Sequence, residues 1–158
     1  MKTKKVFAGL FVLIGLTTLQ VNGQQGKMKT FKGDHCSLKY PAQWQTSSKD
    51  GSWNFFPPEG YGVLTVSYHS EIDFPLERTK KFILDMNEIK ENPKNVKMTR
   101  KGDITEFYYE QVDKGIKWII KAYRKKASLY LLTINCEAKK WNAGKNAFMS
   151  ILTSFKMN

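Results

Sequence analysis

The chain has 158 residues, 41% of them hydrophobic, and its 26 lysines and arginines outnumber its 14 aspartates and glutamates to give a formal net charge of +12. This length allows one domain with a sizeable core and excludes two. Internal repeats and low-complexity tracts are absent from the sequence, so we expect one compact domain.

Residues 1–23 have the three-part layout of a secretory signal peptide. Three lysines within the first five residues precede an apolar run at 6–16, and a polar stretch then ends at Gly23. The apolar run is shorter than the roughly 20 residues that cross a bilayer. No cysteine stands at the end of the run, so lipid anchoring is not supported either. We therefore expect a periplasmic or secreted protein with no transmembrane span after signal removal.

The remainder divides into a flexible leader at 24–30 and a single domain at 31–158. Removing the signal leaves 135 residues with 23 basic and 14 acidic side chains, a net charge of +9. Such an excess attracts nucleic acid, anionic lipid, acidic polysaccharide or an acidic protein. Because an exported protein seldom meets nucleic acid, we expect one of the other three. The alternative is that the charges only keep the protein soluble.

Short apolar-polar alternations predict the strands of the N-terminal half. Pro41 marks a bend between the first two, and Pro57 cannot continue a central strand because proline lacks the ladder donor. The predicted strands lie at 37–41, 43–47, 52–56 and 62–68.

Between residues 75 and 90 the apolar spacing changes to three and four, which predicts a helix. Asp73 suits its cap and Pro75 an early helical position, while Asn92-Pro93 should stop it.

From residue 96 onward the chain again predicts strands, at 96–102, 104–112, 116–124 and 128–136. Their short turns force an antiparallel meander. In the third of these strands, Trp118 shares one face with Ile120 and Ala122. A final helix at 139–156 carries an apolar stripe that includes Phe148 and Ile151. This order predicts an α+β fold, an antiparallel sheet flanked by helices.

The segments LKYPAQW at 38–44 and ILTSFK at 151–156, with this order of elements, resemble the PsbP-like superfamily. That group includes the extrinsic PsbP protein of photosystem II, the Ran-binding Mog-type import factors and bacterial envelope proteins such as DcrB. The resemblance covers about residues 31–156. It implies an α/β/α sandwich used as a binding or assembly module rather than as an enzyme, and it implies no particular ligand. Photosynthetic and Ran-binding functions do not carry over.

The two cysteines, Cys36 and Cys136, are compatible with one disulfide in an exported protein. The alternative is two separate buried thiols. His35 adjoins Cys36, so on a strand their side chains point to opposite faces, and we expect no cysteine-histidine catalysis.

His69, Glu71 and Asp73 alternate along the chain and would share one face if the segment stayed extended. An imidazole with two carboxylates could then hold a divalent metal. We favour the alternative, a polar strand end in which Asp73 caps the helix, and expect no metal and no cofactor. The carboxylates of Glu106 and Glu110 stand about 13 Å apart on a strand, too far for glycoside hydrolysis.

Basic residues gather on one predicted hairpin and carry the most functional information. With an aromatic ring among them, they could bind an anionic polymer or headgroup. The alternative is a solvated hairpin whose lysines block aggregation. We expect an exported, non-catalytic binding or accessory domain, with a metal-dependent or hydrolytic enzyme and a purely structural envelope protein as alternatives. The candidate binding residues are Lys117, Lys121, Tyr123, Arg124, Lys125 and Lys126.

Overall fold

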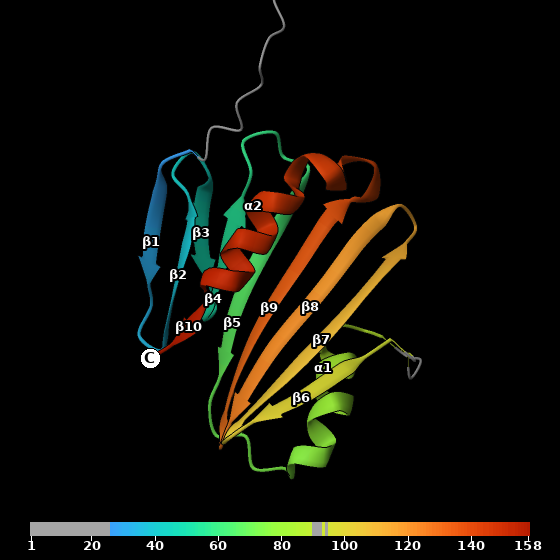
Figure 1. Ribbon diagram of the computed structural model, residues 1–158. Helices are drawn as coiled ribbons and strands as arrows, with labels where there is room; N and C mark the ends of the chain where they lie inside the picture. The colour runs from blue at the N-terminus through green and yellow to red at the C-terminus, as the bar shows by residue number, and fades with distance from the viewer. Residues whose placement is uncertain (1–25, 90–92, 94) are drawn as a thin grey trace, which may run out of the picture.

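The computed structural model describes residues 26–89, 93 and 95–158. The predicted signal peptide and Asn92 of the predicted helix stop lie outside the described residues. Within them the chain forms ten strands in two antiparallel sheets, together with two α-helices (Figure 1). The predicted α+β class is confirmed.

The smaller sheet joins the two ends of the described chain. Its strand order is β1 (Met28–Lys32), β2 (Cys36–Pro41) and β10 (Lys156–Met157). Strand β1 therefore begins inside the segment predicted as a flexible leader, because its backbone pairs with β2 from Met28 opposite Pro41 onward. The leader prediction is corrected for these residues.

The larger sheet has seven strands, and every neighbouring pair is antiparallel. The predicted meander forms its last three strand pairings. Strand β9 lies between β5 and β8, as its apolar residues on both faces predict. In spatial order the strands are β3 (Gln45–Lys49), β4 (Ser52–Phe56), β5 (Gly62–His69), β9 (Ser128–Glu137), β8 (Ile116–Lys125), β7 (Ile104–Asp113) and β6 (Lys97–Lys101).

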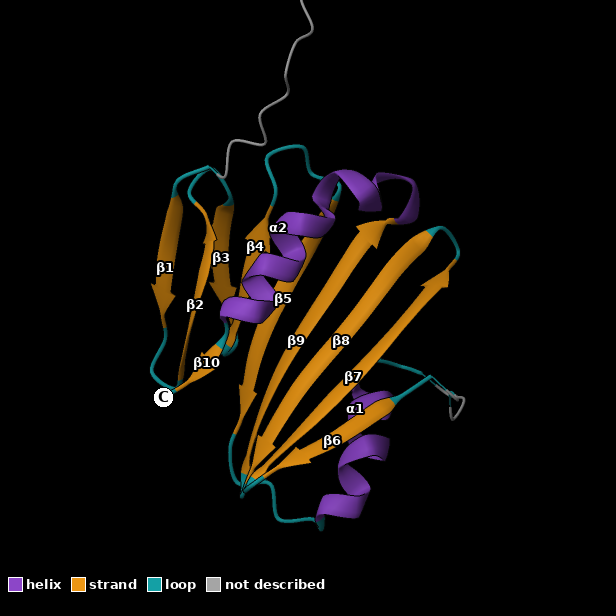
Figure 2. Ribbon diagram, in the orientation of Figure 1, coloured by secondary structure: helices purple, strands orange, loops and turns teal. Residues whose placement is uncertain are grey.

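Helix α2 (Trp141–Ser154) and the smaller sheet cover one face of the larger sheet (Figure 2). The predicted stripe is confirmed, since Gly144, Phe148, Ile151 and Leu152 are the buried residues of the helix. They pack with residues of β2, β4, β5, β8 and β9 in one hydrophobic cluster. Removing this apolar surface from water, at about 25 cal/mol per Å², is what holds the layers together.

Helix α1 (Thr79–Met86), preceded by a single 3-10 turn at Leu76–Arg78, packs on the opposite face. Its Ile83 and Leu84 enter a second cluster with Phe107, Ile120 and other residues of β7, β8 and β9. The molecule is thus a sandwich with a helix on each side of the sheet.

Helix α1 is shorter than the predicted helix at 75–90. It ends at Met86 because Asn87 leaves the helical conformation and donates its side-chain amide to the Ile83 carbonyl at 2.8 Å. At the start of the 3-10 turn no side chain forms a capping hydrogen bond, so the predicted Asp73 cap is not formed.

Candidate functional site

Each helix covers only part of its face of the larger sheet. Figures 1 and 2 show α2 over β5 and β9, and none of the described helices lies over β8, β7 and β6 on that side. We call this uncovered area the open face. It is formed by the side chains of β6, β7 and β8 that point to the α2 side and are not buried in the cluster, among them Lys97, Tyr108, Glu110, Lys117 and Lys121.

Alternation along β8 places the predicted binding residues. Ile119 and Tyr123 are buried in the cluster on the α2 side, whereas Ile120 and Ala122 are buried on the α1 side. Lys117 and Lys121 share the parity of Ile119, so they lie on the open face. This confirms the predicted assignment of faces for the strand.

Lys117 is held at the border between the open face and α2. Its ammonium donates to Glu110 Oε2 at 2.9 Å and lies 5.8 Å from the centre of the Trp141 ring. Its side chain is only 15% exposed. The charge of Lys117 is therefore already matched inside the protein.

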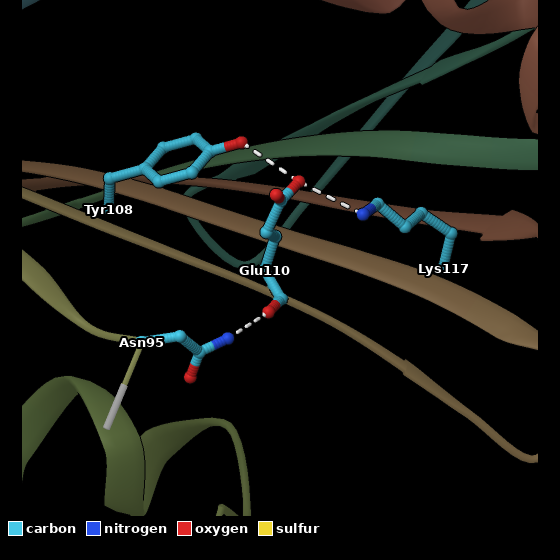
Figure 3. A network of polar contacts seen from close by, with 4 residues as sticks. All are labelled: Asn95, Tyr108, Glu110 and Lys117. Atoms are coloured by element: carbon cyan, nitrogen blue, oxygen red, sulfur yellow. Dashed lines mark hydrogen bonds and ion pairs between the residues drawn. The ribbon is translucent and has the colours of Figure 1, made fainter. Parts of the chain in front are cut away.

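Figure 3 shows the network around Glu110. Tyr108 donates its hydroxyl to Glu110 Oε2 at 3.2 Å, beside the bond from Lys117, and Asn95 donates to the Glu110 carbonyl at 2.5 Å. The hydrogen bond from Lys117 lowers the pKa of Glu110, whereas burial and the Glu110 carboxylate raise the pKa of Tyr108 to about 12. At neutral pH Glu110 is therefore an ionised carboxylate and Tyr108 is a protonated phenol.

Lys121 is the central cation of the open face. Its half-buried side chain lies opposite Tyr108 of the neighbouring strand β7. Its ammonium lies 5.0 Å from the centre of the Tyr123 ring. Tyr123 in turn stacks on Phe155 at 5.1 Å, which fixes the ring.

The carboxylates of the open face are both occupied by other lysines. Glu106 pairs with Lys101 at 3.3 Å, and Glu110 pairs with Lys117. Within the described residues neither Lys121 nor the exposed Lys97 has an ion-pair partner. Two positive charges thus remain unmatched on this surface.

The other predicted binding residues lie elsewhere. Lys125 is at the end of β8, where it approaches Asp103 at 3.8 Å, and Lys126 occupies the following turn with a φ of 54°. A strand rises about 3.4 Å per residue, so Lys125 stands roughly 13 Å from Lys121 along the sheet.

Arg124 points to the α1 side and is 7% exposed. It donates to the Phe74 carbonyl at 2.6 Å, the Pro75 carbonyl at 3.3 Å and the Thr79 hydroxyl at 2.5 Å. These bonds fasten the entry of α1 to the sheet. Arg124 is a structural residue, and the structure does not bring it together with Lys121.

Sequence reasoning did not select Tyr108, Glu110 or Trp141 for the site. The alternation in ITEFYYEQV was a signal that Tyr108 and Glu110 share a face with Glu106. Which face the helices leave open depends on how α2 crosses the sheet, and this information is not local.

The weak candidates for a metal site, His69, Glu71 and Asp73, are not brought together either. His69 ends β5, where its Nε2 lies 3.2 Å from the Ser67 hydroxyl and its ring meets Phe82 edge-on. Glu71 has a φ of 58°, so the extended alternation is broken before Asp73. The described part of the chain contains no group of three metal-binding side chains.

The two cysteines are free and buried, so the disulfide left open by the sequence is not formed. His35, the neighbour of Cys36, stacks on Tyr68 near one end of β5, whereas Cys136 pairs with Gly62 at the other end. Six residues of strand separate these positions, about 20 Å. Burial raises the pKa of both thiols and keeps them protonated.

Among the described helices, none has the length and apolar character needed to cross a bilayer.

Comparison with known proteins gives matches in structure but none in sequence. No family model matches the chain, and no curated protein sequence does. The solution structure of cyanobacterial PsbP (CyanoP) from Synechocystis sp. PCC 6803 matches with a TM-score of 0.62 and 13% identity, over 89% of this chain and 99% of that chain. A crystal structure from Bacteroides thetaiotaomicron VPI-5482 matches with a TM-score of 0.51 and 15% identity, over 85% of this chain and 49% of that chain.

Proposed function

The chain has a PsbP-like fold, and we propose that it is an exported, non-catalytic binding or accessory domain of the cell envelope. In this proposal the open face takes an anionic ligand, which is an acidic protein, an anionic lipid headgroup or an acidic polysaccharide. The signal-like residues 1–23 support the exported location.

The observation that carries the proposal is that Lys121 is half buried and has no carboxylate partner within the described residues. A lysine that is half buried on a sheet loses both water and side-chain freedom, and a carboxylate partner normally offsets this cost. Lys121 has a ring beside it and no carboxylate, while the neighbouring acids are bound to Lys101 and Lys117. A carboxylate, phosphate or sulfate from a ligand would complete this site.

The titration of the neighbouring groups supports binding over catalysis. A general acid or base works best with a pKa near the working pH. On the open face the pKa of Glu110 is lowered and that of Tyr108 is raised to about 12, so both move away from neutrality. Their network serves to hold Lys117 and the surface in place.

Charge reversal at Lys121 tests the proposal. Binding of the mature protein is measured to poly-L-glutamate, to phosphatidylglycerol vesicles and to dextran sulfate, which stand for the three ligand sources. We expect at least one probe to bind, salt to weaken the binding, and Lys121→Glu to reduce it by about tenfold.

Lys49→Glu is the matched control, because Lys49 is exposed on β3 and the substitution changes the net charge equally. It should leave binding close to that of the wild type. Failure of all three probes at low salt, or an equal loss in both variants, would contradict the proposal. Lys121→Met, which keeps the aliphatic stem, should give an intermediate loss.

A further inference from the structure

The α1 side of the larger sheet also has an uncovered area. In Figure 2 helix α1 lies near β6 and β7 at the lower end of the sheet, and none of the described helices lies behind the upper end. Cross-strand pairing arranges the side chains there in two adjacent rows. Gln111, Trp118 and Asn135 form one row across β7, β8 and β9, and Thr133, Thr65 and Asn54 form the other across β9, β5 and β4. We call these six residues the uncharged face.

The absence of charge on these six residues is notable in this protein. The chain has 26 basic and 14 acidic side chains, yet these six residues are amides, hydroxyls and one indole, and Val63 and Ile120 continue the two rows without charge. Among the described residues, charge lies only at the edge of this face, where Asp113 and Glu137 stand in the next row. The uncharged face fits an uncharged ligand with many hydroxyl groups, in contrast to the open face on the other side of the sheet.

Trp118 is the aromatic residue of this face. Trp44, Trp53 and Trp141 pack into the cluster on the α2 side, whereas Trp118 is half buried and is in neither of the two clusters of the described residues. A partly exposed indole offers a flat apolar surface with a polar edge. The C–H face of a pyranose ring stacks on a surface of this kind.

The polar side chains of the uncharged face have free hydrogen-bonding capacity. Asn135 Oδ1 is buried and has no hydrogen-bond partner within the described residues. Gln111 Oε1 accepts from Tyr109 at 2.6 Å, and Asn54 Oδ1 accepts from Thr65 at 2.7 Å, so both amides keep their N–H groups for a ligand. Sugar hydroxyls donate and accept, and they can satisfy both kinds of group.

A second ring stands at the rim of the uncharged face. Phe56 follows Asn54 by two residues on β4, so it points to the same side, and it is 36% exposed. Strands β4 and β8 are three places apart in the sheet, which puts Phe56 and Trp118 about 14 Å apart. A chain of a few sugar rings spans that distance.

We propose that the uncharged face binds a neutral oligosaccharide. One sugar ring stacks on Trp118, and the Gln111 amide donates to a hydroxyl. Rotation of the Asn135 side chain brings its buried Oδ1 to a second hydroxyl, which donates to it. A longer oligosaccharide reaches Phe56. A protein partner fits less well, because Asn135 stands between Trp118 and the apolar Val63 and Phe56, and so small an apolar area does not make an interface core.

The test is titration of the mature protein with neutral gluco-, manno-, galacto- and chito-oligosaccharides, from disaccharide to hexasaccharide. Binding is measured by calorimetry and by the shifts of amide NMR signals. We expect at least one series to bind, with an affinity that salt does not change. Trp118→Ala should weaken it by about tenfold or more and Trp118→Phe by less. Phe56→Ala should weaken only the longer oligosaccharides.

Lys121→Glu is the control, because it should weaken binding of anionic probes on the open face by about tenfold and leave sugar binding unchanged. The two proposals can therefore fail separately. Lack of binding by every series, or wild-type affinity in a folded Trp118→Ala variant, would overturn the oligosaccharide site. So would a dimer that dissociates on Trp118→Phe substitution while no sugar binds, since the face would then be a contact between copies.

Discussion

Arg124 donates a buried 2.5 Å hydrogen bond to the hydroxyl of Thr79, across 45 residues of sequence. The bond joins the end of β8 to the first turn of α1. The same guanidinium reaches the carbonyls of Phe74 and Pro75, so a strand residue organises the helix entry that the sequence assigned to Asp73.

Substitution of Arg124 should therefore affect folding rather than ligand binding. Arg124→Met leaves the carbonyls of Phe74, Pro75 and Lys126 and a buried hydroxyl without this donor, and we expect the free energy of unfolding to fall by roughly 2–4 kcal/mol. Urea denaturation measures the loss. Lys125→Met is the control, since its exposed 3.8 Å pair with Asp103 should contribute less than about 1 kcal/mol. Equal effects of the two substitutions would contradict the role of Arg124.

The phenol of Tyr108 should ionise only in strongly alkaline solution. Burial, followed by the charge of Glu110, raises its pKa to about 12 from an ordinary value of 10. A group with a raised folded-state pKa stabilises the fold fully below pH 10, and this contribution is lost as pH rises from 10 through 12. Absorbance titration of the wild type against Tyr108→Phe isolates this residue among the seven tyrosines. Glu110→Gln should lower the pKa of Tyr108 but leave it above 10, because burial is the larger cause.

Gly144 should tolerate no side chain while Tyr61 is in place. A Cβ on Gly144 would contact the Tyr61 ring and approach its hydroxyl oxygen to 2.7 Å, and this ring packs edge-on against Phe148. We expect Gly144→Ala to destabilise the protein by about 1–3 kcal/mol despite the better helix propensity of alanine. In a Tyr61→Ala background the same change should be neutral or stabilising. Thermal unfolding of the four proteins gives the double-mutant cycle, and additive effects would refute the contact.

Asn135 should lower the stability of the folded protein. Its buried Oδ1 lacks a partner within the described residues, and valine favours strands more than asparagine does. We expect Asn135→Val to raise the free energy of unfolding by about 1 kcal/mol and at the same time to weaken oligosaccharide binding. Denaturant unfolding and calorimetry on one preparation measure both. A destabilised variant would show that the amide has a structural role instead.

Both cysteines should be free and unreactive in the folded protein. Burial raises the pKa of Cys36 and of Cys136, so little thiolate is present near pH 8. We expect a thiol reagent to label the native protein slowly and to find two sulfhydryls per chain after unfolding without reductant. A count near zero would mean that the two are bridged after all.

The features that sequence predicted well are those with a strict period. Alternation separated Lys121 and Tyr123 from Ile120 and Ala122, and the three-and-four spacing identified the buried stripe of α2. The same parity carried a signal for Arg124, which follows Ala122 by two residues and so shares its buried side. The basic run around Arg124 obscured that signal.

Other features depend on contacts that no local pattern records. Strands β1 and β10 consist largely of exposed side chains and exist because their backbones pair with β2. The open face was predictable as a set of lysines on one side of a strand. Local sequence does not show that this face is separate from Lys125 and Lys126 or that it is left uncovered by α2. Both features depend on how the helix and the sheet pack together.

The pairing of β10 with β2 also sets the order in which the chain can fold. The Ser154 hydroxyl accepts a hydrogen bond from the Lys39 backbone N–H at 2.8 Å, and the backbone N–H of Asn158 donates to the His35 carbonyl at 2.9 Å. These contacts close loops of more than 100 residues, the kind that slow folding most. The apolar side of β2 can pack on β4 early through Tyr40 and Phe55, but it is fully enclosed only after α2 has emerged, so one of the first strands to be made is among the last to be completely covered.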